Sequence, residues 1–122
     1  MAYESALPQG VEEYVLHLAD LPANWDSYGA RRVAPRAISR TLEVLRSIYP
    51  RLPRPSSEPF VAPDADGGLG IELALASGGE LLISVDAQGT TTYLLAAAEE
   101  ERSGLLESEA DIQELARGCL AR

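Results

Sequence analysis

An alternation of apolar and polar residues in the middle of the chain, interrupted by glycine turns, constrains the fold more than any other feature. Every second residue is apolar in LGIELAL (69–75) and again in LLISV (81–85). A period of two places successive side chains on opposite faces of a strand. The segments SGGE (77–80) and DAQG (86–89) have the glycine and aspartate of hairpin turns. The pattern therefore predicts consecutive strands of an antiparallel meander.

Two neighbouring segments extend this prediction. TTTYLLA (90–96) is rich in β-branched and aromatic residues, which favour strands. Residues 60–62, ahead of the turn DADGG (64–68), predict a short first strand. We therefore expect three or four strands. The segment 96–107, AAAEEERSGLLE, is compatible with either a helical turn or an acidic loop.

Helical periodicity flanks the predicted sheet on both sides. In the segment 10–21, Val11, Tyr14, Val15 and Leu18 form one apolar stripe. A second helix is expected from Pro35, whose missing N–H is tolerated in a first turn, to Pro50. The last helix is expected in SEADIQELARGCLAR (108–122), where Ser108 and Asp111 have the spacing of a weak capping box.

The proline-rich segment PRLPRPSSEP (50–59) separates the first two helices from the strands. Proline fixes φ and lacks an N–H, so we expect an extended, polyproline-like strap. Neither side of the strap is large enough to fold comfortably alone. The sequence predicts one α+β domain over residues 1–122, with two N-terminal helices, the strap, an antiparallel meander and a C-terminal helix.

Charge is distributed unevenly along the chain, which has a net charge of −9. All basic residues are Arg, and 13 of the 19 acidic residues follow position 57. The N-terminal residues resemble no signal peptide, no apolar run reaches the roughly 20 residues of a membrane span, and a single Cys forms no internal disulfide. We expect a cytoplasmic protein with no membrane partner.

Residues for catalysis are sparse. We expect the one His, His17, to lie on a helix surface and the one Cys, Cys119, on the buried face of the last helix. A Cys–His nucleophile needs both in one cleft. Asp64, Asp66 and Glu72 lack the spacing of a calcium loop and fit a β-turn. The sequence predicts no enzyme, metal site or cofactor.

The segment NWDSYGARR, from Asn24 to Arg32, contains the only Trp of the chain. Its short polar residues and glycine are typical of a turn. One interpretation is that Trp25 and Tyr28 cover the seam between helix and sheet. The other is that they are exposed beside arginines, as in protein–protein hot spots. The two interpretations are compatible if one ring is buried and the other exposed. The candidate partner-binding residues are Trp25, Asp26, Tyr28, Arg31 and Arg32.

The segment NWDSYGA, the helix after it and the stretch VAPDADGGLGIEL (61–73) together resemble a group of small uncharacterised bacterial proteins. Members of that group have a W-D-G-Y-G-A-like motif, a proline-rich strap and a D-G-G turn into a β-meander. Ser27 stands where the group's motif has glycine. The resemblance implies an architecture and no established activity.

These features predict a non-enzymatic bacterial or phage protein that binds another protein, encoded nearby, as an accessory, antitoxin- or immunity-like partner. One alternative is an acidic inhibitor that mimics nucleic acid and occupies a basic groove of a defence or DNA-processing enzyme. A second alternative is a small carboxylate-dependent enzyme. Arg31, Arg32, Arg36 and Arg40 could form a basic strip, but a net charge of −9 argues against direct binding of nucleic acid.

Overall fold

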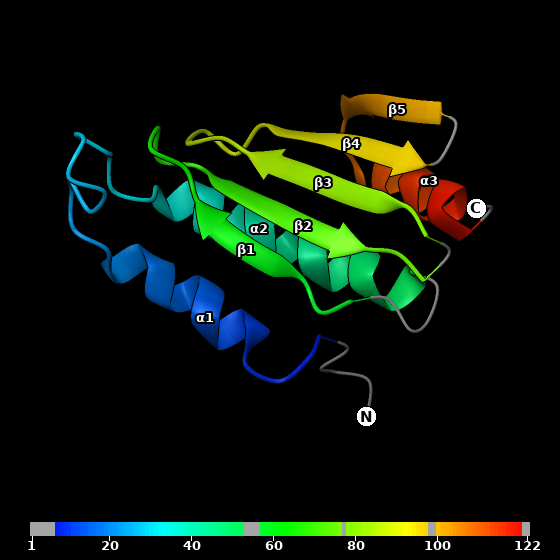
Figure 1. Cartoon of the computed structure of the whole chain (residues 1–122), viewed down its shortest axis with the longest axis horizontal. Coiled ribbons are helices and arrows are strands. Elements are labelled where there is room, and N and C mark those ends of the chain that lie inside the picture. Colours follow the sequence, from blue (N-terminus) through cyan, green and yellow to red (C-terminus); the bar gives the residue numbers. More distant parts are fainter. Residues whose placement is uncertain (1–6, 53–56, 77, 98–99, 121–122) are drawn as a thin grey trace.

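A five-stranded antiparallel sheet forms the centre of the molecule, and each strand lies beside its neighbour in sequence (Figure 1). The computed structural model describes residues 7–52, 57–76, 78–97 and 100–120. The short turns between strands explain the simple order, because each strand pairs with the next as the chain reverses. The strands are β1 (Phe60–Pro63), β2 (Leu69–Ala74), β3 (Glu80–Val85), β4 (Thr91–Ala97) and β5 (Glu100–Leu105).

The fifth strand corrects the expected count of three or four. Residues 100–105, expected to be helical or a loop, pair with β4 from Ala97 opposite Glu100 to Thr92 opposite Leu105. All side chains of β5 are exposed except Arg102, which is half-buried. An edge strand without a buried face has no apolar period, so the pattern that predicted the other strands is missing here.

The helices lie on one face of the sheet (Figure 1). The α2 helix begins at Pro35 as expected, and its apolar stripe, including Ile38, Leu42, Leu45 and Ile48, is buried. In α1 the predicted stripe is buried except for Tyr14, which is 49% exposed. The helical segments are α1 (Val11–His17), η1 (Leu18–Asp20), α2 (Pro35–Ile48), η2 (Tyr49–Arg51) and α3 (Glu109–Leu120).

The core lies between this helical layer and the inner face of the sheet. Leu73, Leu81 and Leu95 stand opposite one another across β2, β3 and β4, and each is at most 1% exposed. Burying such a side chain contributes about 1.5–3 kcal/mol to folding. The alternation in the sequence thus corresponds to the buried face of the sheet, and the other face carries no helix (Figure 1).

Two segment boundaries are set by local chemistry. The strap begins with a 3-10 turn that contains Pro50, where extended chain was expected, and Pro53 and Pro55 lie outside the described residues.

At the start of α3, the Asp111 carboxylate accepts hydrogen bonds from the N–H groups of Glu107 (2.8 Å) and Ser108 (3.1 Å). The N–H of Asp111 donates to Ser108 Oγ at 3.3 Å. The predicted capping box is confirmed.

Candidate functional site

The segment Asn24–Arg32, hereafter the 24–32 loop, connects η1 to α2 and has an unusual backbone. Asn24 and Ser27 both have φ of 66°, and Gly29 has φ of 88°. The left-handed region costs a residue with a Cβ about 1–2 kcal/mol, and asparagine tolerates it better than most. Two such residues within four positions indicate a loop shape that the surrounding contacts maintain.

Two short polar side chains provide those contacts. Asn24 Oδ1 accepts a hydrogen bond from the Gly29 N–H at 2.7 Å. Asp26 Oδ1 accepts from the N–H groups of Tyr28 at 2.8 Å and Ala30 at 3.1 Å. The Asn24 N–H donates to the Ala30 carbonyl at 2.6 Å, which closes the base of the loop. Both side chains therefore form the local turns that the sequence predicted.

Contacts with the β1–β2 turn fix the loop to the sheet. The Arg31 N–H donates to the Ala65 carbonyl at 2.8 Å, and the Ala34 N–H donates to the Gly67 carbonyl at 2.9 Å. A Cβ on Gly67, whose φ is +97°, would lie 3.2 Å from the Arg32 carbonyl oxygen. The glycine therefore permits this close approach between loop and turn.

The two aromatic rings of the loop differ in their environment. Trp25 is half-buried, and its indole Nε1–H donates to the Arg31 carbonyl at 3.2 Å. Tyr28 is 91% exposed, the largest exposed fraction among the exposed large hydrophobic residues of the described chain. The interpretation that both rings cover the seam between helix and sheet is therefore wrong for Tyr28. The loop presents this ring to solvent.

The arginines of the 24–32 loop and of α2 separate into two groups. Among the described residues, the exposed side chains of Arg31, Arg32 and Arg36 form no ion pair with an acidic residue. Arg40 is different: its side chain is 17% exposed and bonds Thr91 Oγ1 (3.0 Å) and the Leu106 carbonyl (2.7 Å). Arg40 thus joins α2 to the sheet and is not part of a free basic strip.

The His and Cys occupy different environments. His17 is exposed near the end of α1, with Nδ1 2.9 Å from the Glu13 carbonyl oxygen. Cys119 has no exposed surface and belongs to the hydrophobic core. The positions agree with the expected surface His and buried Cys.

The acidic β1–β2 turn is held by its own hydrogen bonds, as expected of a β-turn. The Gly67 N–H donates to the Asp64 carbonyl at 3.1 Å, and the Gly68 N–H donates to Asp66 Oδ1 at 3.0 Å. Partial burial raises the pKa of Asp64, and the nearby Asp66 carboxylate raises it further. Within the described ranges, no group of three or more His, Cys, Asp or Glu side chains is placed to hold a metal ion.

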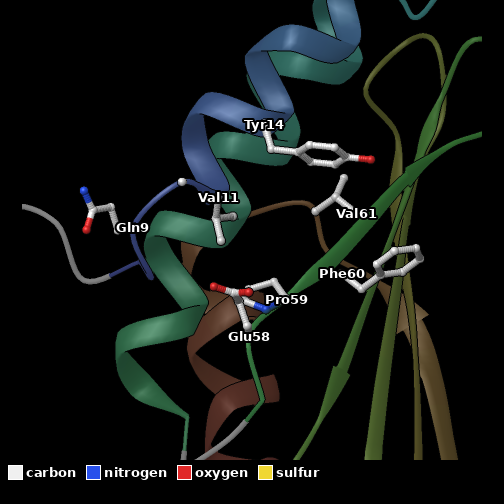
Figure 2. A pocket seen from close by; sticks show the side chains of 8 residues that line it. Gln9, Val11, Tyr14, Glu58, Pro59, Phe60 and Val61 are labelled. Carbon is white, nitrogen blue, oxygen red and sulfur yellow. The ribbon is translucent and has the colours of Figure 1, made fainter.

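A hollow of about 410 Å³ lies between α1 and β1 and was not predicted from the sequence. Figure 2 shows Tyr14 of α1 and Val61 of β1 meeting across it, with Phe60 directed to the other side of the strand. Its lining includes one carboxylate, that of Glu58, and otherwise uncharged residues. Nothing in the sequence indicated this surface, because Tyr14 had the same spacing as the buried residues of its stripe.

No protein-family model, curated protein or solved structure matches the chain. The resemblance to small bacterial proteins accordingly stays a prediction. None of the described helices has the length and apolar character needed to cross a membrane.

Proposed function

We propose that this protein is non-enzymatic and acts by binding a partner protein through the 24–32 loop. The observation that carries the proposal is the 91% exposed ring of Tyr28 on a loop with two non-glycine residues at positive φ. Backbone strain of this kind persists where the surroundings impose it, and it is concentrated at functional sites. A ring that adds nothing to the core needs another reason to be held there.

The five candidate residues divide into contact and positioning roles. Tyr28 supplies the central aromatic contact, and Arg31 and Arg32 supply exposed guanidinium groups on the same loop. Trp25 and Asp26 act within the protein, because each bonds the loop backbone. Hydrogen bonds to the Asn24 and Asp26 side chains already order the loop backbone, so little backbone entropy is lost on binding, which favours affinity.

The size and charge of the chain support a more specific proposal. A chain of 122 residues with a net charge of −9 suits an accessory, antitoxin- or immunity-like partner in a bacterial or phage gene pair. A net charge of this magnitude acts on the rate of encounter at long range, whereas the loop itself exposes Arg31 and Arg32. We therefore expect the partner, a protein encoded nearby, to present carboxylates to the loop.

The test compares two exposed tyrosines. Full-length wild type, Tyr28→Ala and Tyr14→Ala are used as baits in lysate of the native host, and bound proteins are quantified by mass spectrometry. We expect one partner retained by wild type and by Tyr14→Ala, because Tyr14 lies on α1, and lost by Tyr28→Ala. The purified partner should bind Tyr28→Ala at least about tenfold more weakly, as expected of a hot-spot tyrosine.

The same comparison can contradict the proposal. Removing an exposed side chain changes the free energy of unfolding by less than about 0.5 kcal/mol, so Tyr28→Ala should unfold like wild type. A folded Tyr28→Ala variant that binds the partner with unchanged affinity would show that the loop is not the contact surface.

A second candidate is the acidic inhibitor that mimics nucleic acid. Its supporting observation is the exposed carboxylates of β5, α3 and the segment between them, which include Glu101, Glu107 and Glu114. Binding through these groups would weaken steeply between 50 and roughly 300 mM salt as the charges are screened. A flat salt response, or equal binding by Glu101→Gln and Glu107→Gln variants, would remove this candidate.

A further inference from the structure

The two edges of the sheet differ in how well they are protected against further strand pairing. β1 and β5 each pair with one neighbour, so each has one side of its backbone directed away from the sheet. Unpaired N–H and C=O groups along an edge are a template for another strand, and natural proteins commonly block them. Whether an edge can pair with another strand therefore depends on the N–H and C=O groups that it directs outward.

The β1 edge is blocked by proline. The Asp64 N–H donates to the Gly68 carbonyl at 2.9 Å, and antiparallel pairs alternate between bonded and non-bonded. Ala62 lies two residues before Asp64 and Phe60 lies four residues before it. Both therefore direct their backbone N–H and C=O groups to β2. Positions 59, 61 and 63 face outward, and two of them are prolines without an N–H. Only Val61 offers an outward donor within this stretch.

The β5 edge contains no proline, although it carries the charged residues Glu100, Glu101 and Arg102. The Leu106 N–H donates to the Thr91 carbonyl at 2.9 Å, which sets the alternation along the β4–β5 pair. Glu101, Ser103 and Leu105 consequently direct both N–H and C=O away from β4. Their side chains are exposed, with Leu105 at 51%, and the strand contains no proline. In Figure 1, β5 forms the outermost strand at this edge.

We propose that β5 pairs antiparallel with β5 of a second copy of this chain, about a two-fold axis at Ser103. The pairing would join the two sheets into one. Each of the three outward-facing residues would exchange both of its backbone hydrogen bonds with the other copy, because a symmetric antiparallel pair matches outward positions with outward positions.

The charges of β5 select this register. With Ser103 opposite Ser103 of the second copy, Glu101 lies opposite Leu105 and Arg102 lies opposite Gly104. The other symmetric register of equal overlap places Arg102 opposite Arg102, and like charges directly opposite are destabilising. In the proposed register the two Glu101 side chains are about 14 Å apart along the strands. That separation exceeds the Debye length of about 8 Å at physiological salt, so their repulsion is largely screened.

The first test changes one backbone donor. Wild type, Ser103→Pro and Ser103→Ala are compared by sedimentation equilibrium of the full chain from about 1 μM to 1 mM, a range that covers weak to moderate dimers. Ser103→Pro removes an outward N–H at the axis and no bond to β4, so we expect a folded monomer. Ser103→Ala keeps the N–H and should dimerise like wild type. A wild type that is monomeric throughout, or a Ser103→Pro dimer, would overturn the proposal.

The second test checks the register. Leu105→Glu places one carboxylate of each copy opposite Glu101 of the other, and these two like-charge pairs should weaken the dimer about tenfold, whereas Leu105→Arg should not weaken it. Oxidation should link Ser103→Cys chains into a covalent dimer, because bonded pairs have Cα atoms about 5.5 Å apart, within disulfide reach. Ser84→Cys, exposed on β3, is the control and should stay unlinked. Equal effects of Glu and Arg at 105, or equal cross-linking at 84 and 103, would refute this register.

Discussion

At the scale of single residues, the left-handed Ser27 shows how the 24–32 loop differs from an ordinary connection. Ser27 has φ of 66°, in the left-handed region that favours glycine. No hydrogen bond of its hydroxyl to the described residues compensates for this conformation. The cost is therefore met by the contacts of Asn24 and Asp26 around it.

Replacing this serine tests that cost. We expect Ser27→Gly to raise the free energy of unfolding by about 0.5 kcal/mol, because relief of about 1–2 kcal/mol of strain exceeds the entropy lost by a glycine. Urea unfolding monitored by Trp25 fluorescence gives the measurement. Ser27→Ala keeps the Cβ and should show no gain, so a similar gain for alanine would contradict the strain explanation.

Two buried threonines provide a second comparison at this scale. Thr41 and Thr91 are 0% and 2% exposed. Thr41 Oγ1 has no hydrogen-bond partner among the described residues, whereas Thr91 Oγ1 bonds the Gly89 carbonyl and Arg40 Nε, both at 3.0 Å. A buried hydroxyl without a hydrogen-bond partner costs about 1–3 kcal/mol of folding free energy. The partners of each threonine therefore decide whether its hydroxyl stabilises the protein.

The same replacement should therefore have opposite effects at the two sites. Thr41→Val keeps the volume and removes an unpaired polar group, and we expect it to stabilise the protein by about 1 kcal/mol. Thr91→Val leaves the Arg40 Nε–H without its partner and should destabilise by about 1–3 kcal/mol. Thermal and urea unfolding of both variants would measure this, and equal signs would contradict the hydrogen-bond assignment.

At the scale of elements, the start of α3 carries a pH-dependent contribution. The N–H of Glu107, and then that of Ser108, lower the pKa of Asp111 from its ordinary value. A carboxyl whose pKa is lowered on folding contributes stability above its unfolded pKa, and this contribution is lost as the pH falls through its folded pKa.

A capping variant should reveal this dependence. Asp111→Ala should be less stable than wild type at pH 7, and the difference should shrink below about pH 4 as the wild-type carboxyl becomes protonated. Urea unfolding between pH 7 and roughly pH 2 measures the difference. Glu114→Ala, exposed on the same helix, is the control; a constant difference for Asp111→Ala across this range would contradict the cap.

Element prediction was accurate where one side of the segment was buried. The apolar stripe of α2 and the alternating apolar residues of β2 and β3 are buried in the shared core. The spacing of apolar residues therefore predicted these elements. No side chain of β5 is fully buried, and the strand is held by backbone hydrogen bonds to β4. Such bonds do not depend on which side chains the strand carries. The same fact explains why its open edge could not be identified from the sequence.

At the scale of the whole molecule, Arg40 joins the two layers. Its guanidinium group connects α2 to Thr91 of β4 and to the Leu106 carbonyl just beyond β5, and it also bonds the exposed Glu43 at 3.0 Å. One side chain therefore satisfies polar groups that the helix and sheet would otherwise leave unpaired at their contact.

Removing this connection should cost more than removing an ion pair. We expect Arg40→Ala to lower the free energy of unfolding by about 1.5–3 kcal/mol, because hydrogen bonds of a charged donor to buried groups are lost. Glu43→Ala breaks only a pair whose acid is 66% exposed and should cost less than about 0.5 kcal/mol. Equal losses in urea unfolding would show that the ion pair, not the bonds to the sheet, carries the contribution.

The two proposed surfaces are compatible within one molecule. The 24–32 loop is fixed to the β1–β2 turn, whereas β5 forms the edge of the sheet opposite β1 (Figure 1). A dimer formed through β5 would therefore carry two Tyr28 loops. Two loops in one assembly raise the effective concentration of the second contact when the partner is itself multivalent.

The sequence by itself determined the layered α+β arrangement, the α2 helix, three or four of the strands and the turn chemistry of the 24–32 loop, because each depends on residue spacing or on contacts between near neighbours. Only the tertiary structure decided that Tyr28 faces solvent, that Arg40 is used internally and that β5 is a strand with an open edge. Those three outcomes depend on which distant segments pack together. The spacing of residues along the chain predicts local elements and not the contacts between distant segments.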